Sequence, residues 1–297
     1  MPKVLISGIN GFTGRHLSVE FARRGYQIRG LAHTVSVGAD SGVYECDLLD
    51  LRRLTQICES EQPDVVVHLA AVAFVAHDDV SAIYQTNIVG TRNLLSALVE
   101  AGCKPRSVII ASSANVYGNA VCEILDESAD PAPANDYAVS KLGAEYATRL
   151  WMDRLPITIV RPFNYTGVGQ SEKFLLPKIV AHFRNQASVI ELGNLNVVRD
   201  FSDVRDVASV YARLAEGSFA GQSFNVCSGK GYSLDEILAM VREISGHQLE
   251  VRVNPSFVRA AEVHKLIGDN TRLRNAIGAV SAIALSDTIR WMLGKSA

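Results

Sequence analysis

The feature that most constrains the fold is a series of short apolar runs separated by amphipathic stretches. Runs without apolar–polar alternation, such as Val65–Val67 and Val108–Ile110, are typical of strands that are buried on both faces. Helical patterns lie between the runs, and this alternation predicts an α/β fold with a doubly wound parallel sheet. The predicted strands are Val4–Ser7, Gln27–Ala32, Val65–Leu69, Ser107–Ser112, Ile157–Val160, Val189–Leu192 and Ser223–Cys227.

Three amphipathic stretches predict helices, at Thr13–Arg24, Thr86–Ala101 and Tyr137–Trp151. The first is followed by Gly25 and the second by Gly102, and glycine at these positions is typical of a helix C-terminus. After about residue 163, prolines and glycines mark loops and the elements become less regular. The sequence therefore predicts a smaller C-terminal lobe, with residues 196–227 returning to the sheet.

Composition excludes several classes of protein. The chain is 48% hydrophobic and 20% charged, and its net charge of −2 gives no basic footprint for nucleic acid. No apolar run reaches the roughly 18 residues of a membrane span. The N-terminal residues lead straight into the first strand, so we expect no signal peptide. The five scattered cysteines predict reduced thiols in a cytoplasmic protein, with neither a disulfide framework nor a metal site.

A glycine-rich turn, Gly8-Ile9-Asn10-Gly11-Phe12-Thr13-Gly14, follows the first strand and opens the first helix. Such glycines let the backbone approach a pyrophosphate, and the helix N-terminus offers free N–H groups and the positive end of its dipole. A glycine turn can also be merely a tight connection. Its position after the first strand of an α/β chain favours dinucleotide binding.

The end of the second strand bears on the choice of cofactor. NAD is usually recognised there by an acid and NADP by a cation near the 2′-phosphate. The second strand ends Leu31-Ala32-His33-Thr34, without an acid, and His33 and Arg15 could supply positive charge. We therefore expect NADP(H), with NAD(H) as the alternative and simple solvated side chains as the competing interpretation. Asp47, after the third strand, could accept a hydrogen bond from the adenine amino group.

A serine, a tyrosine and a lysine form the predicted catalytic group. Tyr137 and Lys141 lie one helical turn apart on a shared face. A lysine ammonium, together with an oxidised nicotinamide, would favour the phenolate and lower the tyrosine pKa from its usual value of about 10. Ser113 lies at the end of a strand, where open α/β sheets place ligands. Its hydroxyl could bind the substrate oxygen that Tyr137 protonates.

With these residues the chain resembles the extended short-chain dehydrogenases/reductases that act on nucleotide sugars, over essentially its whole length. Further motifs carry the resemblance: Asp47-Leu48, His68-Leu69-Ala70-Ala71, Asn87 in TNIVGT, residues 112–118, Arg161-Pro162-Phe163-Asn164 and residues 199–207. It implies a Rossmann fold. The cofactor-binding residues that it implies are Gly8, Gly11, Phe12, Thr13, Gly14, His33, Asp47, Leu48, Leu69, Ala70, Ala71, Asn87, Tyr137, Lys141 and Phe163.

The C-terminal segment narrows the resemblance. Residues 259–269, 193–195 and 225–229 look like the nucleotide-contacting segments of GDP-mannose 4,6-dehydratases and GDP-4-keto-6-deoxymannose reductases, although Ala260 stands where those proteins usually carry proline. Arg199 would face the phosphates of the sugar nucleotide. The substrate-binding residues that the resemblance implies are Ser113, Asn115, Asn164, Lys178, Arg199, Arg259 and Glu262. By itself, Arg259 could also be a surface cation.

Asn115 separates two reactions within this branch. In the dehydratases that the chain resembles, a glutamate two residues after the Ser/Thr moves the proton, and an amide cannot do so. Dehydration is therefore disfavoured. The resemblance implies NAD(P)H-dependent reduction of GDP-4-dehydro-6-deoxy-D-mannose at C4, with Tyr137 as the acid and GDP-D-rhamnose as the product, in deoxysugar and lipopolysaccharide biosynthesis. The opposite C4 epimer, GDP-6-deoxy-D-talose, stays open.

Two other functions remain open. A UDP-hexose 4-epimerase uses the same three residues but keeps NAD bound, and a non-catalytic dinucleotide-sensing protein could use the same scaffold. The intact Ser113, Tyr137 and Lys141 argue against the second. The resemblance also implies a homodimer through a four-helix bundle of the helices near Asn87–Ala101 and Tyr137–Trp151, although these faces could equally be buried within one subunit. We expect a dinucleotide-binding part of residues 1–163 and about 197–227, and a substrate lobe of about 164–196 and 228–297.

Overall fold

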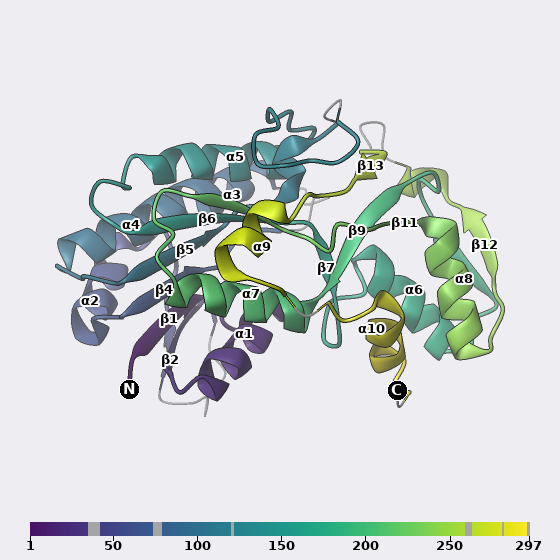
Figure 1. Cartoon of the computed structure of the whole chain (residues 1–297), viewed down its shortest axis with the longest axis horizontal. Helices are drawn as coiled ribbons and strands as arrows, with labels where there is room; N and C mark the ends of the chain where they lie inside the picture. Colours follow the sequence, from purple (N-terminus) through teal and green to yellow (C-terminus); the bar gives the residue numbers. More distant parts are fainter. Residues whose placement is uncertain (35–41, 74–78, 120–121, 259–262, 281, 296–297) are drawn as a thin grey trace.

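The large sheet has seven parallel strands in the part of the chain that the computed structural model describes, which is residues 1–34, 42–73, 79–119, 122–258, 263–280 and 282–295 (Figure 1). Its order is β10-β6-β5-β4-β1-β2-β3. The strands are β1 (Lys3–Ser7), β2 (Gln27–Ala32), β3 (Val43–Glu45), β4 (Val65–His68), β5 (Ser107–Ala111), β6 (Ile157–Pro162) and β10 (Ser223–Val226). Chain order reverses between β1 and β4, and open α/β sheets bind ligands beyond the carboxyl ends at such a point. The predicted doubly wound parallel sheet is confirmed.

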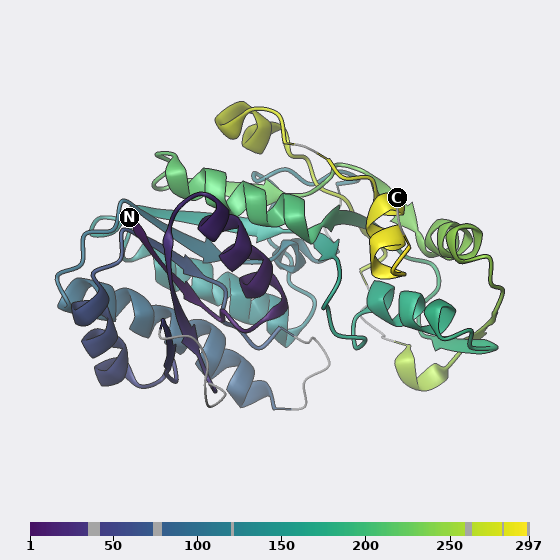
Figure 2. The same cartoon turned by 90° about the horizontal axis from the view of Figure 1, so that it is seen from below.

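Helices cover both faces of this sheet. α1 (Phe12–Arg23) and α7 (Val204–Glu216) pack against each other on one face, and α2 (Leu51–Glu61), α4 (Thr91–Glu100) and α5 (Asp136–Arg149) cover the other (Figures 1 and 2). The observed ends of α1 and α5 lie within two residues of the predicted ones.

The two covered faces explain why the strands lack alternation. In β1, Val4 and Ile6 belong to the core beneath α1 and α7, whereas Leu5 belongs to the core on the other face. All three side chains are fully buried. Neither face of the strand meets water, so apolar and polar residues do not alternate along it.

The helix predicted over residues 86–101 is part of a longer helical run. It begins with α3 (Val80–Tyr84), passes through a π-helical turn at Gln85–Gly90 and continues as α4. Gly102 follows with φ of +65°, as the C-terminal glycine predicts. The π turn is a local widening of the helix, which is rare and often occurs at functional sites.

A second lobe lies beside the sheet, beyond the carboxyl end of β6 (Figure 2). Its small sheet is built on β9 (Val198–Asp203), with β7 (Asn164–Thr166), β11 (Gly231–Ser233) and β13 (Lys265–Leu266) as neighbours, and β8 (Val189–Leu192) pairs separately with β12 (Glu250–Val253). The helices α6 (Leu175–Arg184), α8 (Leu234–Ser245) and α10 (Leu285–Met292) enclose its core, and α9 (Thr271–Ile277) packs against β10.

Residues 196–227 divide between the two sheets. β10 joins the large sheet and α7 covers it, whereas β9 pairs with strands of the second lobe. The second lobe begins at β7, directly after β6, so the carboxyl ends of all the parallel strands face it. Within the described ranges, no helix combines the length and the apolar character that crossing a membrane would require.

Candidate active site

The glycine turn lies between the end of β1 and the start of α1. Gly8 has φ of +72°, and a Cβ there would lie 2.9 Å from the backbone N of Ala70. A Cβ on Gly14 would lie 2.4 Å from the carbonyl oxygen of Gly8. Close backbone packing therefore requires these two glycines. Gly11 is exposed at the N-cap of α1 and has no side chain to cap the free N–H groups there, so this end of the helix stays open to an anion.

A buried polar chain joins the turn to the carboxyl end of β4. The Ser7 hydroxyl accepts hydrogen bonds from the N–H groups of Leu69 and Ala70, both at 3.1 Å, and lies 2.6 Å from Nδ1 of His68. Nε2 of His68 lies 2.9 Å from the Thr91 hydroxyl. Burial and the nearby Lys141 ammonium lower the pKa of His68 to about 3. The ring is therefore neutral and fixes the Leu69–Ala70 backbone beside the glycine turn.

Asn87, a predicted cofactor residue in the π-helical turn, is buried and has its side chain fully engaged. Its amide oxygen accepts from the N–H of Val72 at 2.8 Å, and its amide nitrogen donates to the Ser140 hydroxyl at 2.9 Å. Ser140 in turn donates to the carbonyl of Tyr137 at 2.7 Å. In this structure Asn87 braces the segment after β4 against the first turn of α5.

The predicted catalytic residues come together at the carboxyl end of β5. Tyr137 and Lys141 lie on the buried face of α5, with exposed fractions of 8% and 7%. The Lys141 ammonium donates to the carbonyl of Ala111, the last residue of β5, at 2.8 Å. Ser113 follows two residues later and forms a hydrogen bond with the Tyr137 hydroxyl. One helix and one strand end thus position all three groups.

Asn115 fixes the direction in which the Ser113 hydroxyl points its proton. Ser113 Oγ accepts from the main-chain N–H of Asn115 at 3.2 Å and from its side-chain amide nitrogen at 3.0 Å. A hydroxyl has two lone pairs and one proton. With both lone pairs used, the proton of Ser113 is left to donate toward Tyr137 or toward a substrate oxygen in its place.

Burial dominates the ionisation of the site in the chain alone. It raises the pKa of Tyr137 to about 12, against the opposing hydrogen bond from Ser113. It lowers the pKa of Lys141 to about 8, against the opposing attraction of Glu145. The sequence predicts a lowered tyrosine pKa for the complex with oxidised cofactor. In the chain by itself, the pKa of Tyr137 is raised instead. Tyr137 is protonated at neutral pH, which suits a proton donor.

Aromatic residues after β6 form one wall of the site. Phe163 is buried against the ring of Tyr117, and a Cβ on Gly268 would lie 2.7 Å from the Phe163 ring. Tyr165 stacks on Phe12 with ring centroids 6.1 Å apart, and its hydroxyl lies 2.8 Å from the Thr13 hydroxyl. The segment after β6 is thereby joined to the glycine turn.

Asn164 differs from the other polar groups of the site. Its side-chain nitrogen is buried without a hydrogen-bond partner in the part of the chain that the structure describes. Leaving a buried amide donor unsatisfied costs about 1–3 kcal/mol. Together with the open N-terminus of α1, this donor makes the site fit a polar ligand such as a nicotinamide dinucleotide with its substrate.

Other predicted cofactor residues have varied surroundings. His33 is exposed at the end of β2. Arg15 donates to the carbonyl of Gly169 at 3.0 Å, so its guanidinium is directed at the loop after β7. Asp47 is exposed after β3 and accepts from the N–H of Leu49 at 2.9 Å. The neighbouring Leu48 is buried. A Cβ on Gly90 would lie 2.8 Å from the Cβ of Leu48. Ala71 is half-buried after β4.

Two predicted substrate residues, Lys178 and Arg199, lie on elements of the second lobe. Lys178 on α6 donates to the carbonyl of Glu191 at 2.6 Å and lies 4.5 Å from the centre of the Phe257 ring. Arg199 on β9 donates to the carbonyl of His264 at 3.1 Å. Arg259 and Glu262 lie outside the described residues.

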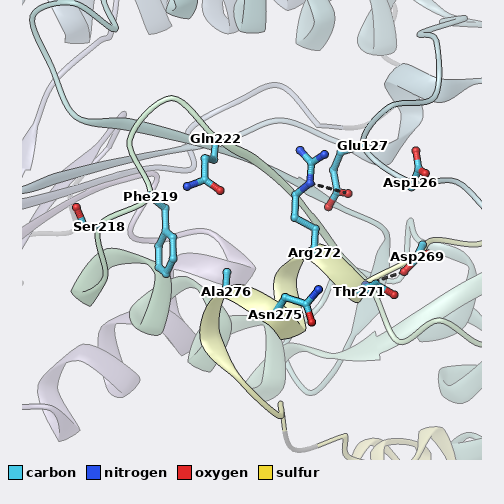
Figure 3. Close-up of a pocket in the computed structure, with 10 residues that line it drawn as sticks. All are labelled: Asp126, Glu127, Ser218, Phe219, Gln222, Asp269, Thr271, Arg272, Asn275 and Ala276. Atoms are coloured by element: carbon cyan, nitrogen blue, oxygen red, sulfur yellow. Dashed lines mark hydrogen bonds and ion pairs between the residues drawn. The ribbon is translucent and has the colours of Figure 1, made fainter.

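A groove of about 630 Å³ lies between α9 and the segments that carry Glu127 and Gln222 (Figure 3). The described residues that line it are Asp126, Glu127, Ser218, Phe219, Gln222, Asp269, Thr271, Arg272, Asn275 and Ala276. Glu127 and Arg272 form an ion pair within it at 3.5 Å. Asp269 belongs to the segment 259–269 that the resemblance gives as nucleotide-contacting, and the other lining residues fall outside the predicted site.

A buried ion pair beneath the catalytic residues was not predicted from the sequence. Glu145 on α5 binds Arg161 on β6 through two hydrogen bonds, of 2.8 and 2.7 Å. Two sequence signals could have revealed it. Glu145 follows Lys141 by four residues on the buried face of the helix, and Arg161 is the one charged residue of the buried strand Ile157–Pro162. The hydrogen-bonded series Ser7, His68 and Thr91 was harder to predict from the sequence, because each is an ordinary polar residue in its segment.

Comparison with known proteins gives a family match and close relatives. The NAD dependent epimerase/dehydratase family matches residues 4–227. The chain is 36% identical to a GDP-6-deoxy-D-talose 4-dehydrogenase from Aggregatibacter actinomycetemcomitans, over 93% of this chain and 91% of that one. It is 33% identical to a GDP-6-deoxy-D-mannose reductase from Pseudomonas aeruginosa, over 98% and 96% of the two chains.

Solved structures agree with these relatives in fold. An epimerase candidate from Burkholderia cenocepacia is 48% identical with a TM-score of 0.92, over 99% of this chain and 97% of that one. The structure of RMD from Pseudomonas aeruginosa in complex with NADPH is 32% identical with a TM-score of 0.86, over 99% and 98% of the two chains.

Proposed function

The chain belongs to the NAD dependent epimerase/dehydratase family, and from this premise we propose that it is a reductase of the C4 ketone of GDP-4-dehydro-6-deoxy-D-mannose that uses NADPH. The observation that carries the proposal is the pair of hydrogen bonds from Asn115 to Ser113. An amide at this position cannot act as the acid–base group of a dehydration. It can hold Ser113 ready to donate to a carbonyl oxygen.

The residues that would hold the cofactor are those at the switch point of the sheet. The N-terminus of α1 at Gly11 would receive the pyrophosphate, and the backbone after β4 would border the bound dinucleotide. A bound reduced nicotinamide supplies the hydride. NADPH is the proposed form because β2 ends without an acid and with the exposed His33, and because a relative of 32% identity binds NADPH.

Tyr137 is the proposed proton donor. In reduction, the oxygen at C4 gains negative charge and must be protonated. Tyr137 holds its proton at neutral pH, and Ser113 would donate a second hydrogen bond to the same oxygen. Lys141, held against Ala111 at 2.8 Å, places a positive charge beneath the tyrosine and stabilises the phenolate that remains.

The second lobe would bind the nucleotide diphosphate of the substrate. Asn164 offers its unsatisfied amide nitrogen at the sugar. Arg199 and Lys178 supply positive charge on β9 and α6, and Arg259 and Glu262 complete the proposed set from sequence alone. The proposed division is a dinucleotide-binding part, residues 1–163 and about 197–227, and a substrate lobe formed by the remainder, with the difference that β9 pairs with strands of the lobe.

GDP-D-rhamnose is the proposed product. Its C4 epimer would result if the other face of the sugar met the nicotinamide, and the relatives include both a deoxymannose reductase and a deoxytalose dehydrogenase. The test is purified protein with the keto sugar and NADPH, followed by product analysis by NMR. Consumption of NADPH with one stereochemically pure product supports the proposal, and no consumption refutes it.

A 4-epimerase is the second candidate, favoured by the epimerase candidate of 48% identity. Such an enzyme keeps its cofactor oxidised and needs no external reductant. Denaturing the purified protein and measuring released NAD separates the two. Stoichiometric NAD, with interconversion of nucleotide hexoses in the absence of NADPH, would replace the reductase proposal.

We propose a homodimer through the helices α4 and α5. The outer side of α5 exposes Val139 and Tyr146, at 40% and 55%, and Leu150, which caps the helix at its C-terminus, is 78% exposed. Apolar side chains in a row on one helix are typical of a protein–protein contact.

The proposed setting is the cytoplasm. The five cysteines, all within the described residues, are free thiols, as in a reducing compartment.

A further inference from the structure

The ion pair between Glu145 and Arg161 is almost completely buried, with side-chain exposures of 1% and 5%. Desolvating two charges cancels much of their attraction, so apolar residues in the same place could be as stable. A contribution to stability therefore does not explain why this ion pair is present. The contacts of Glu145 with the segments that carry the catalytic residues point to a role in the site.

Glu145 is joined to both sides of the catalytic group. Its Oε1 accepts from the Ser112 hydroxyl at 2.5 Å, and Ser112 directly precedes Ser113. It lies one turn after Lys141 on α5, on the same buried face. One carboxylate thus connects the helix of Tyr137 and Lys141 to the strand end of Ser113.

Arg161 holds this carboxylate in one orientation. Its guanidinium binds both carboxylate oxygens, and its remaining nitrogen donates to the Tyr117 hydroxyl at 3.0 Å. Tyr117 in turn donates to the buried Asn225 at 2.7 Å. The carboxylate therefore cannot rotate away from Ser112 without breaking a bidentate contact.

We propose that Glu145 is a positioning residue of the reaction, whose carboxylate fixes Ser113 relative to Tyr137 and places a negative charge one helical turn from Lys141. The inference rests on the proposed function, in which these three residues act together. It assigns a role to Glu145, Ser112 and Arg161 that a purely structural ion pair would lack.

The charges around Lys141 give the sign of the electrostatic effect. Glu145 faces it from its own helix and favours the ammonium, whereas burial opposes the charge. The other groups nearby are the neutral His68 from β4, the protonated Tyr137, and Arg161 from β6, which is neutralised by Glu145. Removing the carboxylate would leave Arg161 unpaired, so both changes make Lys141 lose its proton at lower pH.

The experiment compares three variants of the full chain. Glu145→Gln removes the charge but keeps an acceptor for Ser112, and Ser112→Ala removes only the tether. Thr148→Val is the matched control, because Thr148 is fully buried on the same helix and its hydroxyl has no partner among the described residues. The readouts are kcat and KM across pH, NADPH affinity, thermal unfolding, and the ionisation of Lys141 by NMR of ¹³C-labelled lysine, assigned with Lys141→Met.

We expect Glu145→Gln to move the basic limb of kcat and the Lys141 titration about one pH unit lower. Ser112→Ala should lower kcat about fivefold without moving that limb or the NADPH affinity, a loss typical of one hydrogen bond. Thr148→Val should change neither. Unchanged kcat in Ser112→Ala, or an unmoved lysine titration in Glu145→Gln, would overturn the proposal.

Two further outcomes are decisive. Should Glu145→Gln not fold, the comparison of Ser112→Ala with Thr148→Val decides the inference by itself. A wild-type protein that reduces no nucleotide sugar would refute the proposed function, while the lysine titration would still test Glu145.

Discussion

Replacing Asn115 by aspartate tests the proposed chemistry at one atom. The side chain keeps its shape, but an oxygen replaces the nitrogen that lies 3.0 Å from Ser113 Oγ. An ionised carboxylate can only accept, so it would attract the proton of Ser113 away from the substrate oxygen. The main-chain N–H of Asn115, at 3.2 Å, would still hold the hydroxyl in place.

The energy of one hydrogen bond sets the size of the expected loss. A hydrogen bond to a charged group contributes about 1.5–3 kcal/mol, and this interaction would now compete with the transition state. A cost of about 2 kcal/mol corresponds to a roughly 30-fold fall in kcat. Asn115→Ala, which removes the donor without adding charge, should lose only about 1 kcal/mol, or roughly fivefold.

The assay is NADPH consumption with the keto sugar between about pH 5 and pH 8, a range in which a half-buried carboxyl group can titrate. A protonated aspartic acid can donate to Ser113 as the amide does. The activity of Asn115→Asp should therefore recover toward that of the wild type as pH falls, whereas Asn115→Ala should stay equally slow throughout. An aspartate variant as fast as the wild type at high pH, or one slowed equally at every pH, would refute the reasoning.

Three other predictions concern stability, cofactor binding and assembly. Gly14→Ala should destabilise the fold by about 2 kcal/mol because the new Cβ would lie 2.4 Å from a backbone oxygen, whereas Gly11→Ala should chiefly weaken NADPH binding; thermal unfolding and fluorescence titration separate the two effects. Burial raises the pKa of Asp206 from 3.8 to about 6. The protonated side chain therefore contributes stability at low pH, and this contribution is lost as pH rises through about 6. The shift corresponds to about 3 kcal/mol at most, and solvent screening of the half-buried side chain reduces it to about 1 kcal/mol. Asp206→Asn, which can still accept from the N–H of Ile283, should therefore raise the free energy of unfolding by about 1 kcal/mol near pH 8 and change little near pH 4. Equal denaturation midpoints at pH 8 would contradict this. Leu150→Glu should turn a dimer into a monomer by light scattering, and a monomeric wild type would exclude the proposed interface.

Patterns over several residues predicted most of the fold. The bounds of β2 and β8 agree with the sequence analysis because apolar runs between turn residues leave few alternatives. The π-helical turn was not predictable in this way, because it keeps the helical pattern and changes only the hydrogen bonding. The pairing of β9 with the second lobe also escaped prediction, since no local feature of Val198–Asp203 specifies its neighbours.

Single side chains of the site were predictable only in part. The meeting of Tyr137 with Ser113 followed from helix spacing and from the strand end. The hydrogen bond from Asn115 to Ser113 depends on the tight turn after β5, and that geometry has no signature in the residue order. Likewise, Arg15 donates to the carbonyl of Gly169 after β7, a contact between distant segments that no local pattern predicts.

The most direct test of the proposed function is the fate of the transferred hydrogen. Purified protein would be incubated with GDP-4-dehydro-6-deoxy-D-mannose and NADPH carrying deuterium at the transferable position of the nicotinamide, and the product sugar analysed by NMR. Reduction with Tyr137 as the acid predicts one deuterium, at C4 and in a single configuration. A product without deuterium, or with deuterium at another carbon, would contradict the proposed reaction.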